Sequence, residues 1–134
     1  MGFRNSIIIG FMTIRGQSRL NTDKQIQIED FLKKYKCDIL NLQETDIQPE
    51  TFSTCKYTSS NYNILANNST TNYGTSSLVK SEFVVENIKY DSDGRVMIFD
   101  IDHMTFGNMY FNSGTDSIAR RGRDKLCSEV LPNI

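Results

Sequence analysis

Asp38–Thr45, which reads DILNLQET, says more about this chain than any other stretch. The apolar side chains of Ile39, Leu40 and Leu42 predict a short buried strand, and Glu44 stands at its C-terminal end. Enzymes with α/β folds usually bind ligands and metals at the C-terminal ends of their strands. Mg²⁺ is held by one or two carboxylates and keeps several waters. We therefore predict that Glu44 anchors a divalent cation; the alternative is a solvated carboxylate at a strand end.

The segments around this stretch predict a mixed α/β chain. Residues 6–14 form a nearly continuous apolar run that predicts a buried central strand, and residues 21–36 carry apolar side chains at helical spacing. Together with residues 38–44 they predict a strand–helix–strand opening. Downstream we expect mostly antiparallel strands at residues 61–67, 75–80, 83–90, 95–101 and 105–111, and a helix at residues 118–131.

Composition limits the class of protein. The 134 residues suffice for one domain, 1–134, and the formal net charge of −1 means that nucleic acid could be bound only by a local basic patch. Such a patch could be Arg120, Arg121, Arg123 and Lys125, or these could be a solvated helix start. The three cysteines form no metal-binding or disulfide pattern. No secretion signal or membrane span is recognisable, so we expect an intracellular protein, nuclear or cytoplasmic, that does not bind membranes.

Five segments in order resemble one family. They are residues 12–16 (MTIRG), 38–45 (DILNLQET), 73–79 (YGTSSLV), 94–96 (GRV) and 107–114 (GNMYFNSG). Together they are similar to the endonuclease/exonuclease/phosphatase superfamily, and most similar to the apurinic-type endonuclease domain of non-LTR (LINE-like) retrotransposons. The resemblance implies a DNase I-like sandwich of two mostly antiparallel sheets flanked by helices, here as the N-terminal part of the domain. It also implies metal-dependent cutting of one DNA strand, with DNA and the remainder of a retrotransposon polyprotein as partners.

The resemblance also implies roles for individual residues. Glu44 falls on the family's metal-binding glutamate, with Mg²⁺ as the expected ion and Mn²⁺ as a substitute. Tyr110 falls on a catalytic tyrosine that reaches the scissile phosphate, although an aromatic with a buried ring and a wet hydroxyl would look the same. Thr13 stands where most members have an Asn that supports the metal site, and Thr lacks the amide donor.

Two further residues are candidates for substrate binding from their places in the sequence. Arg15 follows the first predicted strand, close to the predicted metal site, and could contact a phosphate. Asn112 follows the Tyr110 strand and could contact the sugar-phosphate backbone, or it could simply form an Asn-Ser-Gly turn.

Two motifs of the family are missing from this sequence. Members continue into a Gly-Asp-x-Asn strand and end with a Ser-Asp-His segment, and neither occurs here. The pair Asp102-His103 precedes Tyr110 and lies in a predicted turn, so we assign it no catalytic role. Because catalytic groups act as a unit, we expect this chain to be inactive or nearly so. The alternatives are a phosphatase or phosphodiesterase of the same superfamily, a non-catalytic nucleic-acid-binding remnant, or a fragment without function.

Overall fold

The chain folds into two sheets and two helices within the residues that the structure describes. The computed structural model describes residues 6–14, 21–43, 45, 47–48, 50–68 and 74–110. The elements are β1 (Ile9–Thr13), α1 (Thr22–Tyr35), β2 (Ile39–Gln43), α2 (Lys56–Asn61), β3 (Tyr62–Asn67), β4 (Thr75–Lys80), β5 (Val85–Tyr90), β6 (Val96–Ile101) and β7 (Met104–Met109). The helix predicted at residues 118–131 lies outside the described residues.

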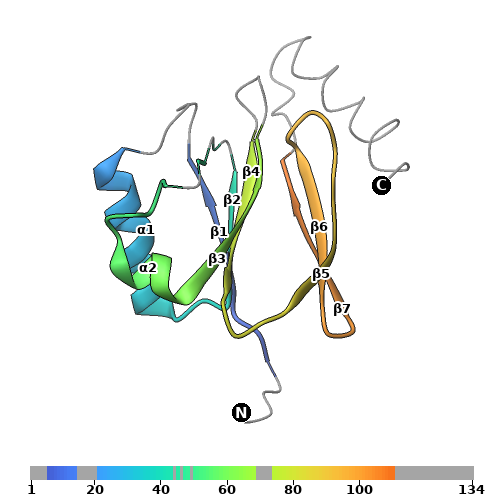
Figure 1. Ribbon diagram of the computed structural model, residues 1–134, viewed down its shortest axis with the longest axis horizontal. Helices are drawn as coiled ribbons and strands as arrows, with labels where there is room; N and C mark the ends of the chain where they lie inside the picture. The colour runs from blue at the N-terminus through green and yellow to red at the C-terminus, as the bar shows by residue number, and fades with distance from the viewer. Residues whose placement is uncertain are drawn as a thin grey trace.

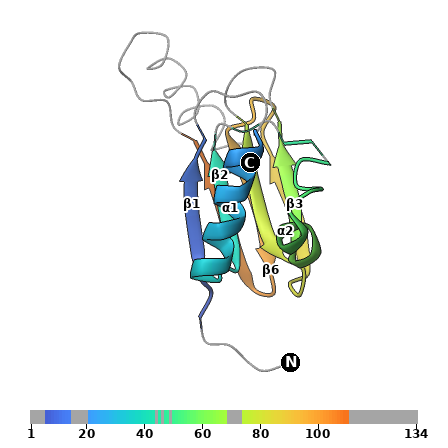
Figure 2. The ribbon, with the colours of Figure 1, turned by 90° about the vertical axis from the view of Figure 1, so that its left-hand side faces the viewer.

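The elements stack in three layers (Figure 1). Sheet A has the strand order β1-β2-β4-β3, and sheet B has the order β5-β6-β7. Helices α1 and α2 cover one face of sheet A, and sheet B packs on its other face (Figures 1 and 2). Strands β1 and β2 pair in parallel across α1, whereas the other strand pairs are antiparallel. The predicted sandwich of two mostly antiparallel sheets is confirmed.

Helix α1 begins and ends as its sequence predicts. The Asn21 side chain accepts a hydrogen bond from the amide of Lys24 at 2.9 Å and so caps the first turn. Lys36 closes the other end in a left-handed conformation, and its amide donates to the carbonyl of Leu32. Ile28 and Leu32 are fully buried against sheet A. This helix therefore fixes the crossover between the two parallel strands.

Strand β2 is the centre of the molecule because both of its faces are buried. Leu40 and Leu42 pack into the core between sheet A and the helices. Ile39 points to the opposite face and packs with Phe99 and Ile101 in the core between the sheets. Alternate side chains of a strand point to opposite faces, so one five-residue strand contributes to both cores.

The expectation of a buried central strand at residues 6–14 is wrong. Strand β1 lies at the edge of sheet A, and the side chains of Ile9 and Phe11 are 39% and 64% exposed. A continuous apolar run predicts burial on both faces, but it contains no information about how many strands flank it. Within the described part of the chain, one edge of β1 therefore has no partner strand, and much of one face is exposed.

Helix α2 was not predicted from the sequence, because KYTSSN has neither helical spacing nor strong helix formers. It is held in place by Glu29 of α1. One carboxylate oxygen of Glu29 accepts hydrogen bonds from the Thr58 amide at 2.8 Å and the Thr58 hydroxyl at 2.9 Å. Burial by itself would raise the pKa of Glu29, but the hydrogen bonds from Thr58 and the charge of Lys33 outweigh it and lower the pKa. The ionised form is therefore the one that holds the two helices together.

We predict that this contact makes part of the stability pH-dependent. Because the pKa of Glu29 is lower in the folded than in the unfolded chain, its stabilisation is fully present above the ordinary value of 4.5 and is lost as pH falls through the folded-state pKa. Glu29→Ala should lower the free energy of unfolding by about 2 kcal/mol at pH 7 and flatten its acid dependence. Urea unfolding between pH 3 and pH 7 measures both effects. Asp30→Asn, which changes an exposed carboxylate of the same helix, should leave both nearly unchanged.

Candidate functional site

The C-terminal ends of β1, β2 and β7 meet at one end of the sandwich, which we call the polar end. The space between the sheets is apolar at its other end, where Ile39, Val79 and Phe99 pack together. At the polar end it is crossed instead by carboxamide side chains. These are Gln43, Asn67 and Asn108. Each donates a hydrogen bond to a backbone carbonyl of the opposite sheet or of the segment that leads into it.

Asn108 makes the largest number of these contacts. Its side-chain amide is fully buried and donates to the carbonyls of Leu42 at 3.2 Å and Ser76 at 2.9 Å, with the Ser77 hydroxyl at 3.4 Å. It thereby ties β7 to both β2 and β4. Its Oδ1 is buried and has no hydrogen-bond partner in the structure, which leaves one acceptor unsatisfied at this end.

Gln43 joins two of the predicted site residues. Its amide donates to the carbonyl of Met109 at 2.5 Å, and its Oε1 accepts from the Thr13 hydroxyl at 3.4 Å. Tyr110 directly follows Met109, is half-buried, and donates its amide hydrogen to the Arg95 carbonyl at 2.8 Å. The structure thus places Thr13 and the start of the Tyr110 segment at the same end of the sandwich, with Gln43 between them.

The other three predicted site residues lie outside the described residues. They are Glu44, Arg15 and Asn112. Glu44 stands in the sequence between Gln43 and Thr45, both of which the structure describes at the polar end. Among the described residues, no three His, Cys, Asp or Glu side chains gather as a metal-binding group.

The chain beside Glu44 is held in a fixed position by close backbone contact. The Thr45 amide donates to the Gly74 carbonyl at 3.2 Å, and the Thr45 and Ser76 hydroxyls lie 2.8 Å apart. Gly74 has a φ of +37°, and a Cβ built on it would lie 1.5 Å from the Thr45 carbonyl oxygen. Only glycine permits this approach, so Gly74 determines where the chain leaves β2.

Sequence reasoning did not assign a role to Gln43, Gly74 or Asn108. A signal for Asn108 and Asn41 was present, since each is a carboxamide inside a strand of otherwise apolar pattern. Such a residue must find a partner once it is buried, and Asn41 does so by accepting from the Ser77 hydroxyl at 2.6 Å. The identity of the partners depends on the register between the sheets, which the local pattern does not contain.

The described cysteines and the Asp102-His103 turn do not add to the candidate site. Cys37 and Cys55 are buried free thiols, and burial raises the pKa of both. The predicted turn at Asp102-His103 is confirmed, and both side chains are exposed there. Within the described ranges, no helix is long and apolar enough to cross a bilayer.

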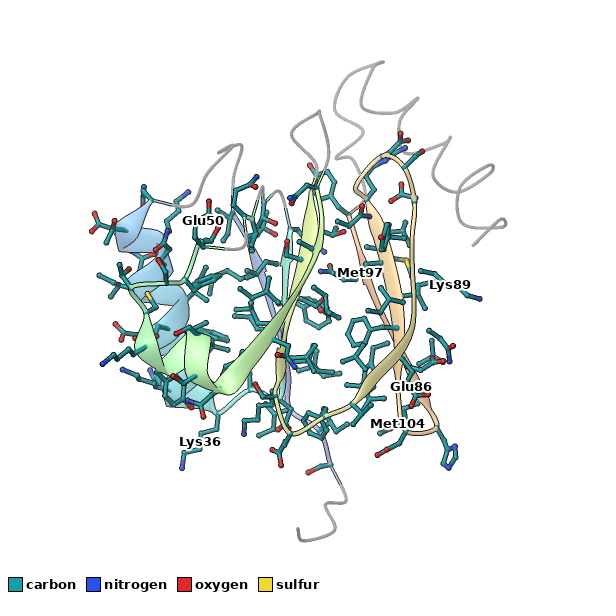
Figure 3. The ribbon with its side chains drawn as sticks, in the orientation of Figure 1. Lys36, Glu50, Glu86, Lys89, Met97 and Met104 are labelled. Carbon is teal, nitrogen blue, oxygen red and sulfur yellow. The ribbon has the colours of Figure 1, made fainter. Side chains whose placement is uncertain are left out.

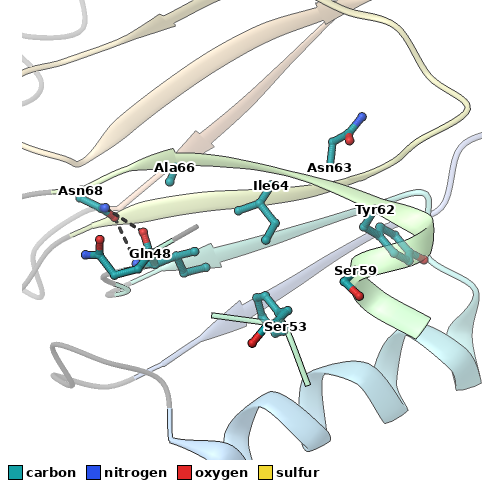
Figure 4. Close-up of a pocket in the computed structure, with 10 residues that line it drawn as sticks. Gln48, Ser53, Ser59, Tyr62, Asn63, Ile64, Ala66 and Asn68 are labelled. Carbon is teal, nitrogen blue, oxygen red and sulfur yellow. Dashed lines mark hydrogen bonds between the residues drawn. The ribbon is translucent and has the colours of Figure 1, made fainter. Parts of the chain in front are cut away.

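A pocket of about 530 Å³ lies at the opposite edge of sheet A (Figure 4). It is bounded by β3, Ser59 of α2 and the segment around Gln48 and Ser53, and it is lined by neither Thr13 nor Tyr110. Asn68 closes one side by hydrogen bonding to both the amide and the carbonyl of Ile47. The pocket is therefore separate from Thr13 and Tyr110.

Comparison with known proteins identifies the fold. No protein-family model and no curated protein matches the chain in sequence. Among solved structures, it is similar to the 3′ phosphatase NExo from Neisseria bound to a product DNA hairpin (16% identity, TM-score 0.67, 90% of this chain and 48% of that one). It is also similar to an AP endonuclease from Archaeoglobus fulgidus (19% identity, TM-score 0.65, 88% of this chain and 47% of that one). A third similar structure is TDP2 from Caenorhabditis elegans (20% identity, TM-score 0.65, 96% of this chain and 43% of that one).

The fold is therefore DNase I-like. The chain spans less than half the length of each of these three structures. The fold class expected from the five sequence segments is thus confirmed, whereas the narrower likeness to retrotransposon endonucleases stays a prediction.

We predict that Asn108 is the main polar tie between the sheets. Asn108→Ala leaves the buried carbonyls of Leu42 and Ser76 without this donor, so the free energy of unfolding should fall by roughly 2–4 kcal/mol. Urea denaturation followed by circular dichroism measures the change. Asn63→Ala, at an exposed carboxamide of β3, is the matched control and should change stability by less than about 0.5 kcal/mol. Equal effects of the two substitutions would contradict this role.

We also predict that Gly74 tolerates no side chain. Gly74→Ala combines a positive φ with a direct clash against the Thr45 carbonyl, and should cost about 2 kcal/mol or more. Gly107→Ala in β7 is the matched control, because the nearest atom to its new Cβ is the flexible end of Met109 at 3.2 Å. Thermal melting of the two variants side by side checks the difference, and a Gly74→Ala protein as stable as the control would refute the prediction.

Proposed function

We propose that this chain carries part of the active site of a metal-dependent phosphodiesterase that cuts one strand of DNA, of the retrotransposon endonuclease kind. The observation that carries the proposal is the meeting of β1, β2 and β7 at the polar end. There Gln43 connects Thr13 with Met109, the residue before Tyr110, and Glu44 is the next residue in the sequence. The similar structures support it, since their names include a 3′ phosphatase bound to a DNA product and an AP endonuclease.

The side chains at the polar end suit a hard cation. The described side chains there offer hydroxyl and carboxamide oxygens as ligands, without a thiol or imidazole, and Mg²⁺ prefers oxygen ligands. In this proposal Glu44 holds Mg²⁺, and Mn²⁺ can substitute for it. When bound, the ion would neutralise charge on the phosphodiester and on its leaving oxygen.

The other residues would orient the substrate. The Gln43 amide is held by the Met109 carbonyl, so its Oε1 faces the Thr13 hydroxyl and fixes the direction of that group. Tyr110 is anchored through its backbone to Arg95, and its phenol would donate to a phosphate oxygen in the proposed complex. Arg15 and Asn112 are proposed to contact the sugar-phosphate backbone from the segments after β1 and β7.

We propose that catalysis by this chain alone is weak. It lacks the Gly-Asp-x-Asn and Ser-Asp-His motifs expected for the family, and it spans less than half of the similar structures. DNA binding should survive such a loss better than turnover, because phosphate contacts add up while catalytic groups act as a unit. Metal-dependent DNA binding is therefore the more sensitive measure of the site.

We predict that Mg²⁺ strengthens the binding of a duplex with an abasic-site analogue about tenfold, which fluorescence anisotropy at constant ionic strength can measure. Glu44→Gln should abolish this metal effect because it removes the anchoring charge. Glu50→Gln is the matched control, since Glu50 is an exposed glutamate close to Glu44 in the sequence (Figure 3). It should leave the metal effect intact.

Two other outcomes have clear meanings. Binding that is the same in Mg²⁺ and in EDTA, and the same in Glu44→Gln, would refute the metal site and favour a non-catalytic nucleic-acid-binding protein. Rapid plasmid nicking in Mg²⁺ that Glu44→Ala abolishes would support the metal site and contradict weak catalysis.

A further inference from the structure

The four outer strands of the two sheets differ in how their edges are protected. The edge of β5 carries Glu86 and Lys89, which project away from sheet A in Figure 3, and its register is interrupted between them. Beside β3 lies the segment at Ile47, whose amide and carbonyl both bond to the Asn68 side chain. Charges, irregular register and covering segments are the usual ways to stop an edge from pairing. Strands β1 and β7 have neither charges nor an irregular register. Their sequences, IGFMT and MTFGNM, contain no charged residue or proline, and both strands pair in regular register with their neighbours.

The outer edges of β1 and β7, which have no partner strand among the described residues, lie on the same side of the sandwich. Asn108 of β7 bonds to β2 and β4, which places β7 over these two strands. Ile9 is in register with Ile39, a residue of the core between the sheets, so Ile9 and Phe11 face the same way. They nevertheless remain 39% and 64% exposed. Among the described residues, sheet A therefore extends beyond sheet B on this side, and no strand lies over the inner face of β1.

We propose that a second copy of this chain covers this side and forms a two-fold symmetric dimer in which β1 of each copy pairs with β7 of the other. The two-fold axis would run parallel to the strands, midway between the sheets. Strand β1 of each copy, which extends beyond sheet B, then lies beside β7 of the other copy. Each layer becomes one continuous seven-stranded sheet, four strands from one copy and three from the other.

The directions of the strands permit this pairing. Strand β1 is parallel to β2, and the C-terminal ends of β2 and β7 meet at the bond from Gln43 to Met109. Strands β1 and β7 therefore run the same way, and an axis parallel to the strands preserves that direction. The paired strands are parallel, and the polar ends of the two copies lie at the same end of the dimer.

Self-complementarity favours a second copy as the occupant. One copy offers two different open edges, and the two-fold operation satisfies both at once, as in an isologous interface. The proposal does not depend on the proposed function, because it concerns the sheet edges alone.

Sedimentation equilibrium in the absence of DNA and metal tests the dimer. The wild-type chain should sediment at twice its mass of 15.4 kDa. Phe11→Lys places a charge on the apolar inner face of β1 and should raise the dissociation constant about 30-fold or more. Tyr90→Lys is the matched control, since Tyr90 is an exposed aromatic on β5, the protected edge, and it should leave the dimer intact.

Cross-linking tests the pairing itself and does not depend on the folding of the lysine variant. Phe11 replaced by p-benzoylphenylalanine keeps the aromatic side chain and, in a mixture of ¹⁴N- and ¹⁵N-labelled chains, should cross-link to residues 104–109 of the other copy. A wild-type chain that stays monomeric up to about 100 µM would overturn the proposal. Equal dissociation by Phe11→Lys and Tyr90→Lys, or cross-links that join only the two β1 strands, would overturn it as well.

Discussion

Hydrogen bonds from carboxamide side chains to backbone carbonyls hold the two sheets together at the polar end, and the candidate site depends on them. Elsewhere the sheets are separated by apolar side chains such as Phe99 and Met97, which pack without direction. Asn108, Gln43 and Asn67 instead require defined angles and distances, because a buried amide without partners is costly. They therefore fix the register between the sheets as well as their spacing. Residues on different sheets consequently keep fixed positions relative to one another.

This arrangement explains why the candidate site lies at one end of the sandwich. At the other end the core between the sheets is apolar, whereas the polar end has backbone and side-chain oxygens from three strands. Gln43 serves both purposes, since its amide ties β2 to β7 and its Oε1 accepts from Thr13. Gly74 adds a fixed exit from β2 through its contact with Thr45. A rigid frame thus holds Gln43 and Thr45, the residues on either side of Glu44 in the sequence, and catalytic groups are usually positioned by such a frame.

The same side of the molecule carries both the open strand edges and the end of β1 at which Thr13 stands. In the proposed dimer, Thr13 of one copy would lie next to the segment that holds Tyr110 of the other, because β1 and β7 end at the same level. The interface and the candidate site would then be neighbours. Stability and substrate binding could therefore be linked through association, since a ligand that binds only the dimer also stabilises it.

Local patterns in the sequence were enough to predict most elements of the described chain, since the Asn21 cap, the helical spacing after it, the apolar run in β2 and the alternation in β6 depend on nearby residues. Motif resemblance added the fold and the candidate roles of Glu44 and Tyr110. Three things could not be read from the sequence: the edge position of β1, helix α2, and the partners of Asn108 and Gln43. Each depends on contacts between residues far apart in the chain, such as Glu29 with Thr58 and Gln43 with Met109. Only the packing of the layers brings such residues together, because periodicity specifies which face a side chain occupies but not what lies opposite that face.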